Sequence, residues 1–541
     1  MASMTNTNIS IKPLAVNLLW RYGPIIGCVW FCACTVGPDF HKPDNNSLDS
    51  WQQLPASHDT ANSASESLEN NADQSWWRQF NDSLLNSLID KAIKENLTLQ
   101  TATTLLAQSR AQRGIAAADQ FPVINGNASY SRVQSSQEGI LNLTKTLLGG
   151  NSTATSANGT GLSSNAGGAG LGAVGLPSAR IAPFNLYQFG FDAAWELDLW
   201  GRVQREQESA QAGVEVAREQ HHAAQLSVIA EVARNYFELR RLQHNLDLVK
   251  QQETLAQEQF DLTGFKTNNG LATHIDLENA KLLLTNIQSQ IPLLNQQIEQ
   301  AGNQLTLLLG EQPGALSKQI IPSAPMPVIP QQVRLGLPNQ LAERRPDIRE
   351  AEANLHRTLA NIGMATADFY PRFTLSGSTG LQALKLKDLG SWSALQYAMG
   401  PSIMLPIFQG GRLVSTLELR EEEHKQAAIN YQNTVLSAWH EIDNNLSAYQ
   451  ESQHRQQVLD LSVQSNTQIV EMDEQRFKSG ISDYLSVLQA RIALLRSEQN
   501  QIDGENSIAG NLIALYKALG GGWQVTQDQQ LEERQVDKDI K

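Results

Sequence analysis

Histidines next to acidic residues are the side chains of this chain whose types could support catalysis or metal binding. His221 and His222 are adjacent, so a helix would point them to different sides, and no glutamate completes the HExxH pattern of zinc proteases. His440 and Glu441 are also neighbours in a helical stretch, and we expect both to face solvent. No set of serine, histidine and acid is recognisable as a nucleophilic triad. We therefore predict no enzymatic activity, no metal site and no cofactor.

The three cysteines, Cys28, Cys32 and Cys34, lie near the N-terminus and indicate processing rather than disulfide pairing. They lie in or just after the mostly apolar run GPIIGCVWFCA, which is too short to span a bilayer and ends in small residues, as secretory signals do. We predict that residues 1–33 are a lipoprotein signal peptide and that Cys34 is lipidated. An export signal without lipidation is the alternative.

Charge and composition restrict the partners of the chain. Asp and Glu outnumber Lys and Arg by 55 to 41, and the net charge of -14 argues against nucleic acid, which would require clustered basic residues. Aromatic residues make up 6% of the chain, a low share for a compact enzyme. Residues 34–75 are rich in Asn and Ser and contain several prolines, so we expect an extended tether along a surface.

A strand followed directly by a helix is predicted from residues 184–202, FNLYQFGFDAAWELDLWGR. Apolar residues alternate with polar or small ones up to Leu197, which favours a strand with one face toward hydrocarbon and the other toward water. The apolar face comprises Tyr187, Phe189, Phe191, Ala193, Trp195 and Leu197. After Gly201 and Arg202 the apolar period becomes helical for roughly sixty residues. We therefore place a strand-to-helix junction at these two residues.

The second half of the chain repeats the first. AQRGIAAADQFP at 111–122 matches ANIGMATADFYP at 360–371, and the junction residues match Gly411 and Arg412, 210 positions further on. Each repeat is expected to hold a helix, a β-hairpin and a helical hairpin, and the first β-hairpin has the longer loop, which is rich in Ser, Thr, Asn and Gly. In chain order, the predicted parts are the signal peptide 1–33, the acylated tether 34–75, a first repeat 76–310 with its loop at 135–182, a linker 311–342, a second repeat 343–522 and a polar tail 523–541.

The two β-hairpins give the chain four strands. Besides the strand described above, strands are expected around 124–130, 373–379 and 397–407, and a helix is expected from Leu84 to Ala118. A soluble sandwich would need a second sheet to pack on, and none is predicted. The smallest membrane β-barrels have about eight strands, so four strands cannot close one. The chain must therefore associate with further copies if it spans a membrane.

Long helical hairpins make up most of each repeat. Apolar residues recur at alternating spacings of three and four, as in a coiled coil, at Leu284, Ile287, Ile291, Leu294, Ile298, Ala301, Leu305 and Leu308. The preceding helix supplies the partner seam, and we place the tip of this hairpin at Gly264 and Gly270. The second seam weakens at Gln499 and Asn506, where polar side chains would fix the register or face water. A helix of about sixty residues is near 90 Å long, comparable with the depth of a periplasm.

Several segments occur in this chain in the order typical of one known family. They are CTVGPDFHKP at 34–43, WWRQFNDSLLNSLI at 76–89, ELDLWGR at 196–202, ERRPDIREAEANL at 343–355 and LPIFQGGR at 405–412. On these segments the chain resembles the TolC-like outer-membrane factors, in the lipoprotein branch that serves resistance-nodulation-division (RND) efflux pumps. The resemblance extends from Cys34 to about Gly522.

The resemblance implies a mixed α+β membrane protein. Three chains, with four strands each, would close a twelve-stranded transmembrane β-barrel continued by an α-helical coiled-coil barrel in the periplasm. This homotrimer would be a passive duct in the bacterial outer membrane, anchored through acylated Cys34. It would receive drugs, toxic compounds or metal ions from an inner-membrane RND pump through a periplasmic adaptor protein. An outer-membrane component of a type I secretion system and a periplasmic coiled-coil scaffold are the alternatives.

The resemblance also implies roles for the ends of the helical hairpins. The residues at the periplasmic tips that would contact the adaptor are Gly270, Gly480, Phe477 and Asp483. Asp276 and Gln489 would lie at the periplasmic gate, although the family frequently has an aspartate where this chain has Gln489. An exposed helix carboxylate is the alternative for Asp276, and a helix N-cap is the alternative for Asp483.

Overall fold

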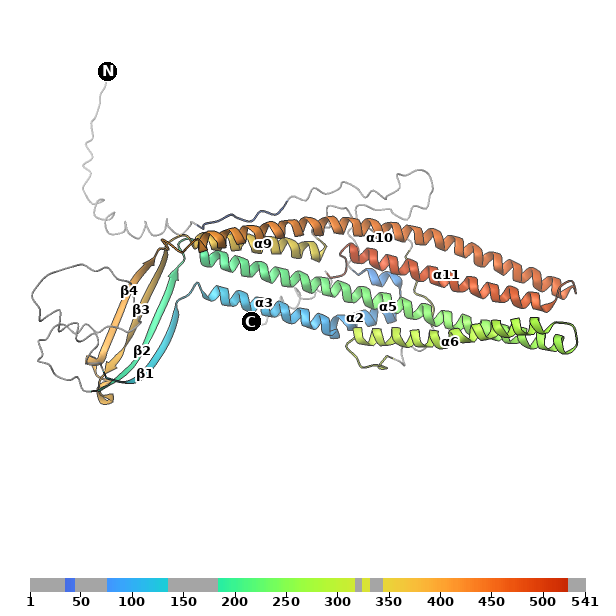
Figure 1. Ribbon diagram of the computed structural model, residues 1–541, viewed down its shortest axis with the longest axis horizontal. Helices are drawn as coiled ribbons and strands as arrows, with labels where there is room; N and C mark the ends of the chain where they lie inside the picture. The colour runs from blue at the N-terminus through green and yellow to red at the C-terminus, as the bar shows by residue number, and fades with distance from the viewer. Residues whose placement is uncertain (1–34, 44–74, 135–182, 317–323, 331–343, 524–541) are drawn as a thin grey trace, which may run out of the picture. The chain divides into compact units, whose positions relative to one another are not determined.

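The computed structural model describes residues 35–43, 75–134, 183–316, 324–330 and 344–523 (Figure 1). The chain divides into two compact units. The first comprises Met1–Thr35, Ala117–Gln204 and Ala367–Gly410, and the second comprises Val36–Ala116, Arg205–Thr366 and Gly411–Lys541. The predicted signal peptide, Cys34, most of the tether and the loop at 135–182 lie outside the described residues.

A single four-stranded antiparallel sheet with the strand order β1-β2-β3-β4 is the main feature of the first unit (Figure 1). Its strands are β1 (Val123–Val133), β2 (Phe184–Leu197), β3 (Arg372–Ala383) and β4 (Leu395–Met404), and two 3-10 turns, η3 (Leu386–Asp388) and η4 (Trp392–Ala394), connect the last two. All four strands were predicted from alternation. The last prediction ran too far, because β3 begins at Arg372, which pairs with Met404, so Leu405 and Ile407 have no partner strand in the sheet.

Two long helical hairpins account for most of the second unit. One is formed by α5 (Arg202–Asn268) and α6 (His274–Leu308), and the other by α10 (Arg412–Lys478) and α11 (Tyr484–Ala518). The longer helix has 67 residues and the shorter one 35 in both hairpins. At 1.5 Å per residue, the longer helix of each hairpin extends about 100 Å. Helices α10 and α11 lie side by side along the whole of the shorter one (Figure 1).

Shorter elements complete the second unit, and two of them lie where a single helix was predicted. They are η1 (Trp76–Phe80), α2 (Ser83–Glu95), α3 (Leu97–Ala118) and α9 (Pro346–Ala367). The single helix predicted from Leu84 to Ala118 is wrong, because Asn96 has an extended backbone between α2 and α3. Its side-chain oxygen accepts a hydrogen bond from Leu99 N (2.9 Å), and its Nδ2 donates to Leu308 O (2.7 Å). Asn96 thus caps α3 and ties the break to α6.

Apolar side chains from both hairpins form the core of the second unit. The predicted seam is confirmed: Leu284 and Ile287 pack with Val249 and Ala256, and Leu305 is fully buried in the larger cluster. The polar residues of the second seam form hydrogen bonds between helices. Gln252 Nε2 donates to Gln499 Oε1 (3.0 Å), and Asn506 Nδ2 donates to Glu238 Oε2 (3.0 Å). Such pairs fix the register between α5 and α11.

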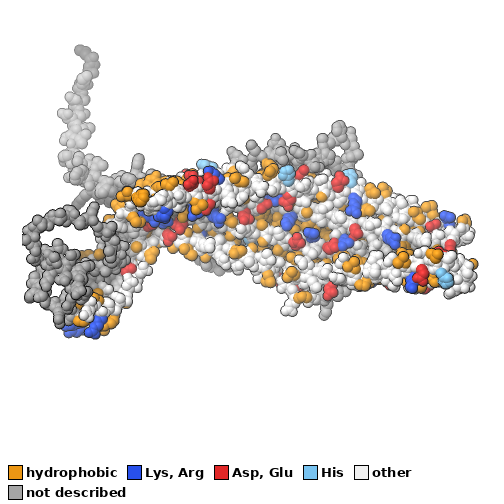
Figure 2. Space-filling view, viewed as in Figure 1, with side chains coloured by type: hydrophobic (Ala, Val, Ile, Leu, Met, Phe, Trp, Pro, Cys, Tyr) orange, Lys and Arg blue, Asp and Glu red, His pale blue; other side chains and the backbone are white. Residues whose placement is uncertain are grey.

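The helices carry charges of both signs. On the face shown in Figure 2, lysines and arginines are interspersed with aspartates and glutamates along the helices. Among the described residues, no helix is both long enough and apolar enough to cross a bilayer. Within the same ranges, His, Cys, Asp and Glu side chains do not gather in groups of three or more that could hold a metal ion.

Candidate functional site

The sheet presents one apolar and one polar face, because the pairing aligns residues of the same kind across all four strands. The apolar face bears Tyr130, Tyr187, Phe189, Phe191, Trp195, Leu375, Tyr397 and Met399. The polar face bears Asn125, Asn127, Ser129, Gln188, Asp192, Ser376, Ser378 and Gln396. Since successive side chains of a strand point to opposite faces, this pattern makes one face of the sheet suited to lipid and the other suited to water.

The polar face is hollowed rather than flat. A cavity of about 800 Å³ lies against it, lined by residues of all four strands. Gly190 and Gly380 are paired in the middle of the sheet, and a Cβ on Gly190 would lie 2.6 Å from Thr379 O. Only glycine permits this close approach of β2 and β3. Because neither glycine has a side chain, the middle of the hollow stays open at this pair.

Two edges of the sheet are open. Within the described residues, β1 pairs only with β2, and β4 pairs only with β3. Each outer edge therefore presents a row of backbone N–H and C=O groups. In hydrocarbon, every such group without a partner costs several kcal/mol, so an open sheet of this kind cannot span a bilayer alone.

Glycines in a left-handed backbone conformation precede both long helices. Gly201 has φ 80° and Gly411 has φ 86°. The residues that follow them, Arg202 and Arg412, are the first residues of α5 and α10. Arg202 Nε donates to Glu196 Oε1 at 2.9 Å, which joins the start of α5 to the end of β2. These are the four residues at which the sequence predicted strand-to-helix junctions.

The two hairpin tips have the same backbone geometry. Gly270 has φ 73° and Gly480 has φ 71°, and no heavy atom lies within 4 Å of a Cβ placed on either glycine. In the first tip, Leu271 N donates to Lys266 O (2.8 Å), which closes a Schellman motif. Gly264, which was also predicted to mark the tip, lies inside α5. A glycine within a helix costs only about 1 kcal/mol, so it is tolerated there and does not end α5.

Asp276 forms part of the cap at the start of α6, whose N-cap residue is Thr273. Its Oδ2 accepts hydrogen bonds from Thr273 N (2.9 Å) and Thr273 Oγ1 (2.7 Å), while Asp276 N donates to Thr273 Oγ1 (3.2 Å). This is a capping box. The side-chain and backbone hydrogen bonds from Thr273 lower the pKa of Asp276 below its usual value of 3.8. The spacing of Thr273 and Asp276 is the sequence signature of such a cap, so this role was predictable although it was not predicted.

Asp483 holds the position at the start of α11 that Thr273 holds at the start of α6, but it makes a different contact. It is the N-cap residue, yet its side chain accepts no capping hydrogen bond. Its Oδ2 instead forms an ion pair with Lys266, near the end of α5. This pair joins the two hairpins near their tips. Next to it, the rings of Phe477 and Tyr484 pack with their centroids 5.1 Å apart.

Gln489 lies on α11, five residues after Tyr484, at which this helix begins. It lines a hollow of about 380 Å³ between the two hairpins, together with residues such as Gln259, Ser462 and Arg496. Asp276 and Gln489 form no hydrogen bond with each other in the part of the chain that the structure describes. Asp276 is not among the residues that line this hollow.

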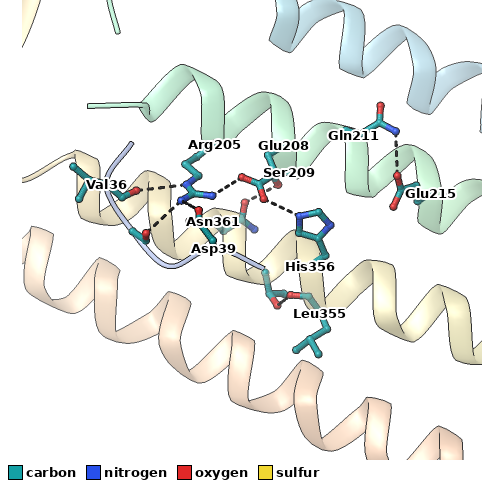
Figure 3. A network of polar contacts seen from close by, with 12 residues as sticks. Val36, Asp39, Arg205, Glu208, Ser209, Gln211, Glu215, Leu355, His356 and Asn361 are labelled. Carbon is teal, nitrogen blue, oxygen red and sulfur yellow. Dashed lines mark hydrogen bonds and ion pairs between the residues drawn. The ribbon is translucent and has the colours of Figure 1, made fainter. Parts of the chain in front are cut away.

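Residues 36–43, which belong to the predicted tether and to the family-typical segment CTVGPDFHKP, bind to α5 and α9, and we call them the strap. Arg205 is its main contact, as Figure 3 shows. The buried guanidinium of Arg205 donates to Asp39 Oδ1 (2.6 Å) and Gly37 O (3.3 Å) of the strap, and to Glu208 Oε2 (2.7 Å) on its own helix. A Cβ on Gly37 would lie 2.6 Å from Gly363 Cα, so the strap also lies against the backbone of α9.

His356 holds the second half of the strap. Its ring stacks on Phe40 with the centroids 4.3 Å apart. Its Nε2 lies 2.7 Å from Glu208 Oε1 (Figure 3). Burial alone would raise the pKa of Glu208, but hydrogen bonds from Arg205 and His356 outweigh it and hold the pKa below the usual 4.5. No local pattern in the sequence could have revealed these contacts, since the strap and its partners are more than 160 residues apart.

The fold defines a class of protein: one whose chain combines an amphipathic four-stranded sheet with two long helical hairpins. A model of the outer membrane efflux protein family matches residues 88–311 and 337–521, well over half of the chain. The chain belongs to this family.

Individual relatives agree with this assignment. The outer membrane protein OprJ of Pseudomonas aeruginosa is 29% identical over 495 residues, which cover 91% of this chain and 93% of OprJ. The solvent efflux pump outer membrane protein SrpC of Pseudomonas putida is 30% identical over 454 residues, which cover 83% and 87%. The solved structure of the outer-membrane channel OprN superposes with a TM-score of 0.75 at 30% identity and covers 91% of this chain and all of its own. The protein is thus an efflux channel of the bacterial outer membrane.

Proposed function

We propose that three copies of the chain join the open edges of their sheets into one closed barrel of twelve strands. The observation that carries this proposal is the open amphipathic sheet. Because each strand is antiparallel to the next, β1 and β4 run in opposite directions. The β4 edge of one copy can then pair antiparallel with the β1 edge of the next, and closure satisfies every backbone group. The apolar face meets lipid, and the hollowed polar face lines the lumen.

The helical hairpins continue this barrel into the periplasm as a tunnel. Two internal repeats build it, and the equal lengths of α5 and α10 and of α6 and α11 support this arrangement. The left-handed glycines support it as well, since Gly201, Gly270 and Gly310 have φ values within 6° of those of Gly411, Gly480 and Gly520. Six hairpins, two from each chain, would then surround the lumen.

The tunnel receives its solutes from an inner-membrane RND pump through a periplasmic adaptor. The exposed tip turns at Gly270 and Gly480, with Phe477 and Asp483 beside them, are the surface on which the adaptor docks. The names of the relatives as pump components support this partnership. The solutes are drugs, other toxic compounds or metal ions. One relative, 26% identical, is the cation efflux system protein CusC of Escherichia coli. Asp276 and Gln489 belong to the gate region behind the tips.

Cys34 carries the lipid that anchors each chain. The strap begins two residues later, and its contacts with Arg205 and His356 fix the chain directly behind the anchor. A lipid chain attached so close to a fixed segment adds membrane affinity to that of the barrel. Replacing Cys34 by Ala should therefore remove lipid labelling and leave barrel closure intact, since closure depends on strand pairing.

Fractionation and mass measurement test the proposal. The full-length protein is produced in a Gram-negative host, and its outer-membrane extract is analysed by native mass spectrometry before and after heating. We expect an oligomer of three chains that dissociates on heating, and a strain lacking the protein should accumulate a fluorescent pump substrate. A monomer in the periplasmic fraction would instead identify a coiled-coil scaffold and overturn the proposal.

A further inference from the structure

Asp192 is the one charged residue in the middle of the polar face. The charged residues of the four described strands are Arg132, Asp192, Glu196 and Arg372. Glu196 is paired with Arg202, and Arg372 with Asp368, both at the end of the sheet near the helices. Arg132 lies at the opposite end of the sheet, on the other face. Unlike Glu196 and Arg372, Asp192 has a neutral partner: its Oδ1 accepts a hydrogen bond from Asn127.

The neighbours of Asp192 leave its carboxylate partly exposed. In the paired row that crosses all four strands, it lies between Asn125 and Ser378, with Ala398 beyond. The next row on the polar face contains Gly190 and Gly380, which have no side chains at all. The carboxylate therefore opens into the hollow of the polar face, which it lines.

We propose that Asp192 determines the charge preference of the channel and favours cationic over anionic solutes in the barrel lumen. The inference rests on the proposed function, which brings three copies of this carboxylate around one lumen. Charges of one sign along a cleft with walls of low dielectric constant concentrate counter-ions between them. Mobile salt screens this effect within about 10 Å at 0.1 M and about 30 Å at 0.01 M, so the preference must be strongest at low ionic strength.

A reporter thiol next to Asp192 tests this local potential. Ser378 pairs directly with Asp192 and is replaced by Cys in the full-length outer-membrane protein, whose natural cysteines all lie at or before Cys34. The rates of modification by a cationic and an anionic methanethiosulfonate reagent are then compared. Their ratio cancels any change in the reactivity of the thiol itself. It is measured with Asp192 intact and after Asp192→Asn, at about 0.01 M and about 1 M salt.

We expect Asp192→Asn to lower the ratio of cationic to anionic rates roughly fivefold at low salt and to leave it nearly unchanged at 1 M. Asp388→Asn, in the turn η3, is the matched control and should leave the ratio unchanged. Native mass spectrometry checks assembly, and Asp192→Ser replaces Asp192→Asn if that variant does not assemble. A ratio that is unaffected at low salt by removal of the Asp192 charge overturns the inference.

The face on which the reagents act separates this inference from the proposed function. Met399→Cys places a thiol on the apolar face of β4. If Met399→Cys reacts and Ser378→Cys does not, the polar face does not line water, and the proposed function falls together with the inference. If Ser378→Cys reacts but its rate ratio does not depend on Asp192, only the inference is refuted.

Discussion

Asp276 combines a helix cap with a charge near the proposed gate, and the two roles can be separated by mutation. Thr273→Ala removes the hydroxyl of the cap, which typically costs about 1 kcal/mol of helix stability, but keeps the charge. Asp276→Asn keeps an oxygen that can accept from Thr273 N and removes the charge. We expect faster hydrogen exchange at 271–280 mainly in Thr273→Ala, and altered cation block of single-channel conductance only in Asp276→Asn. Altered cation block in both variants, or in neither, would contradict a gate charge at Asp276.

Arg205 should control whether the strap stays bound. Arg205→Ala leaves Asp39 and Glu208 without their guanidinium partner, so a spin label at the exposed position 41 should become more mobile. Arg234→Ala, at an exposed position further along the same helix, is the control and should change little. Because folding lowers the pKa of Glu208, its ionised carboxylate stabilises the folded state at a pH above its usual pKa of 4.5. This stabilisation is lost as the pH falls below 4.5 and the carboxylate becomes protonated. A label that is equally immobile in Arg205→Ala at pH 7 would show that other contacts hold the strap.

At the scale of single residues, the sequence revealed positions of unusual backbone but not their contacts. Gly270 and Gly480 could be found because the repeat aligned them and because helix ends favour glycine. The ion pair between Lys266 and Asp483 could not, since its partners are 217 residues apart and neither has a distinctive neighbourhood in the sequence. Arg205 was missed for the same reason: only the fold brings the strap to α5.

Helix ends with the same dihedral angle should respond differently to substitution, depending on what surrounds them. Gly270 and Gly310 have φ of 73° and 70°, but a Cβ on Gly310 would lie 2.6 Å from Glu95 O, whereas nothing lies near Gly270. Gly270→Ala should therefore cost about 1 kcal/mol, and Gly310→Ala about 1–3 kcal/mol more, because a backbone oxygen cannot easily move away. The temperature at which the oligomer dissociates on a gel measures both variants. Equal shifts would contradict this explanation.

Gly270→Ala should in addition reduce export while the oligomer still forms. The substitution changes a surface turn at which the adaptor is proposed to dock, and the strain is too small to unfold an assembly of this size. Efflux of a fluorescent substrate from intact cells is the measurement, and the amount of oligomer in the outer membrane is the control. Normal efflux with normal assembly would place the adaptor contact elsewhere.

At the scale of elements, periodicity was sufficient wherever one residue pattern continued without interruption. The four strands and the two long hairpins were predicted because alternation and heptad spacing extend over many residues. The break at Asn96 was missed because the apolar spacing continues on both sides of a single extended residue. The end of β4 was misplaced because the pattern goes on to Ile407, whereas strand length depends on the partner strand.

The whole molecule depends on a contact that one chain cannot make. The four described strands form a sheet with two open edges. The number of copies needed to close them came from the resemblance to a known family, not from any pattern in the residues. Strand closure by itself requires only a barrel of at least about eight strands, in multiples of four. The number three is therefore the central claim to be tested.

Disulfide cross-linking between edge strands tests that claim most directly. Ser129→Cys on β1 is combined, one at a time, with Gln396→Cys, Ala398→Cys, Gly400→Cys and Ser402→Cys on β4, all on the polar face. After mild oxidation in the outer membrane, we predict that at least one pair gives a ladder of cross-linked species on a denaturing gel that ends at three chains. A ladder that stops at two chains or continues beyond three, or the absence of cross-links between chains for every pair, would contradict the account.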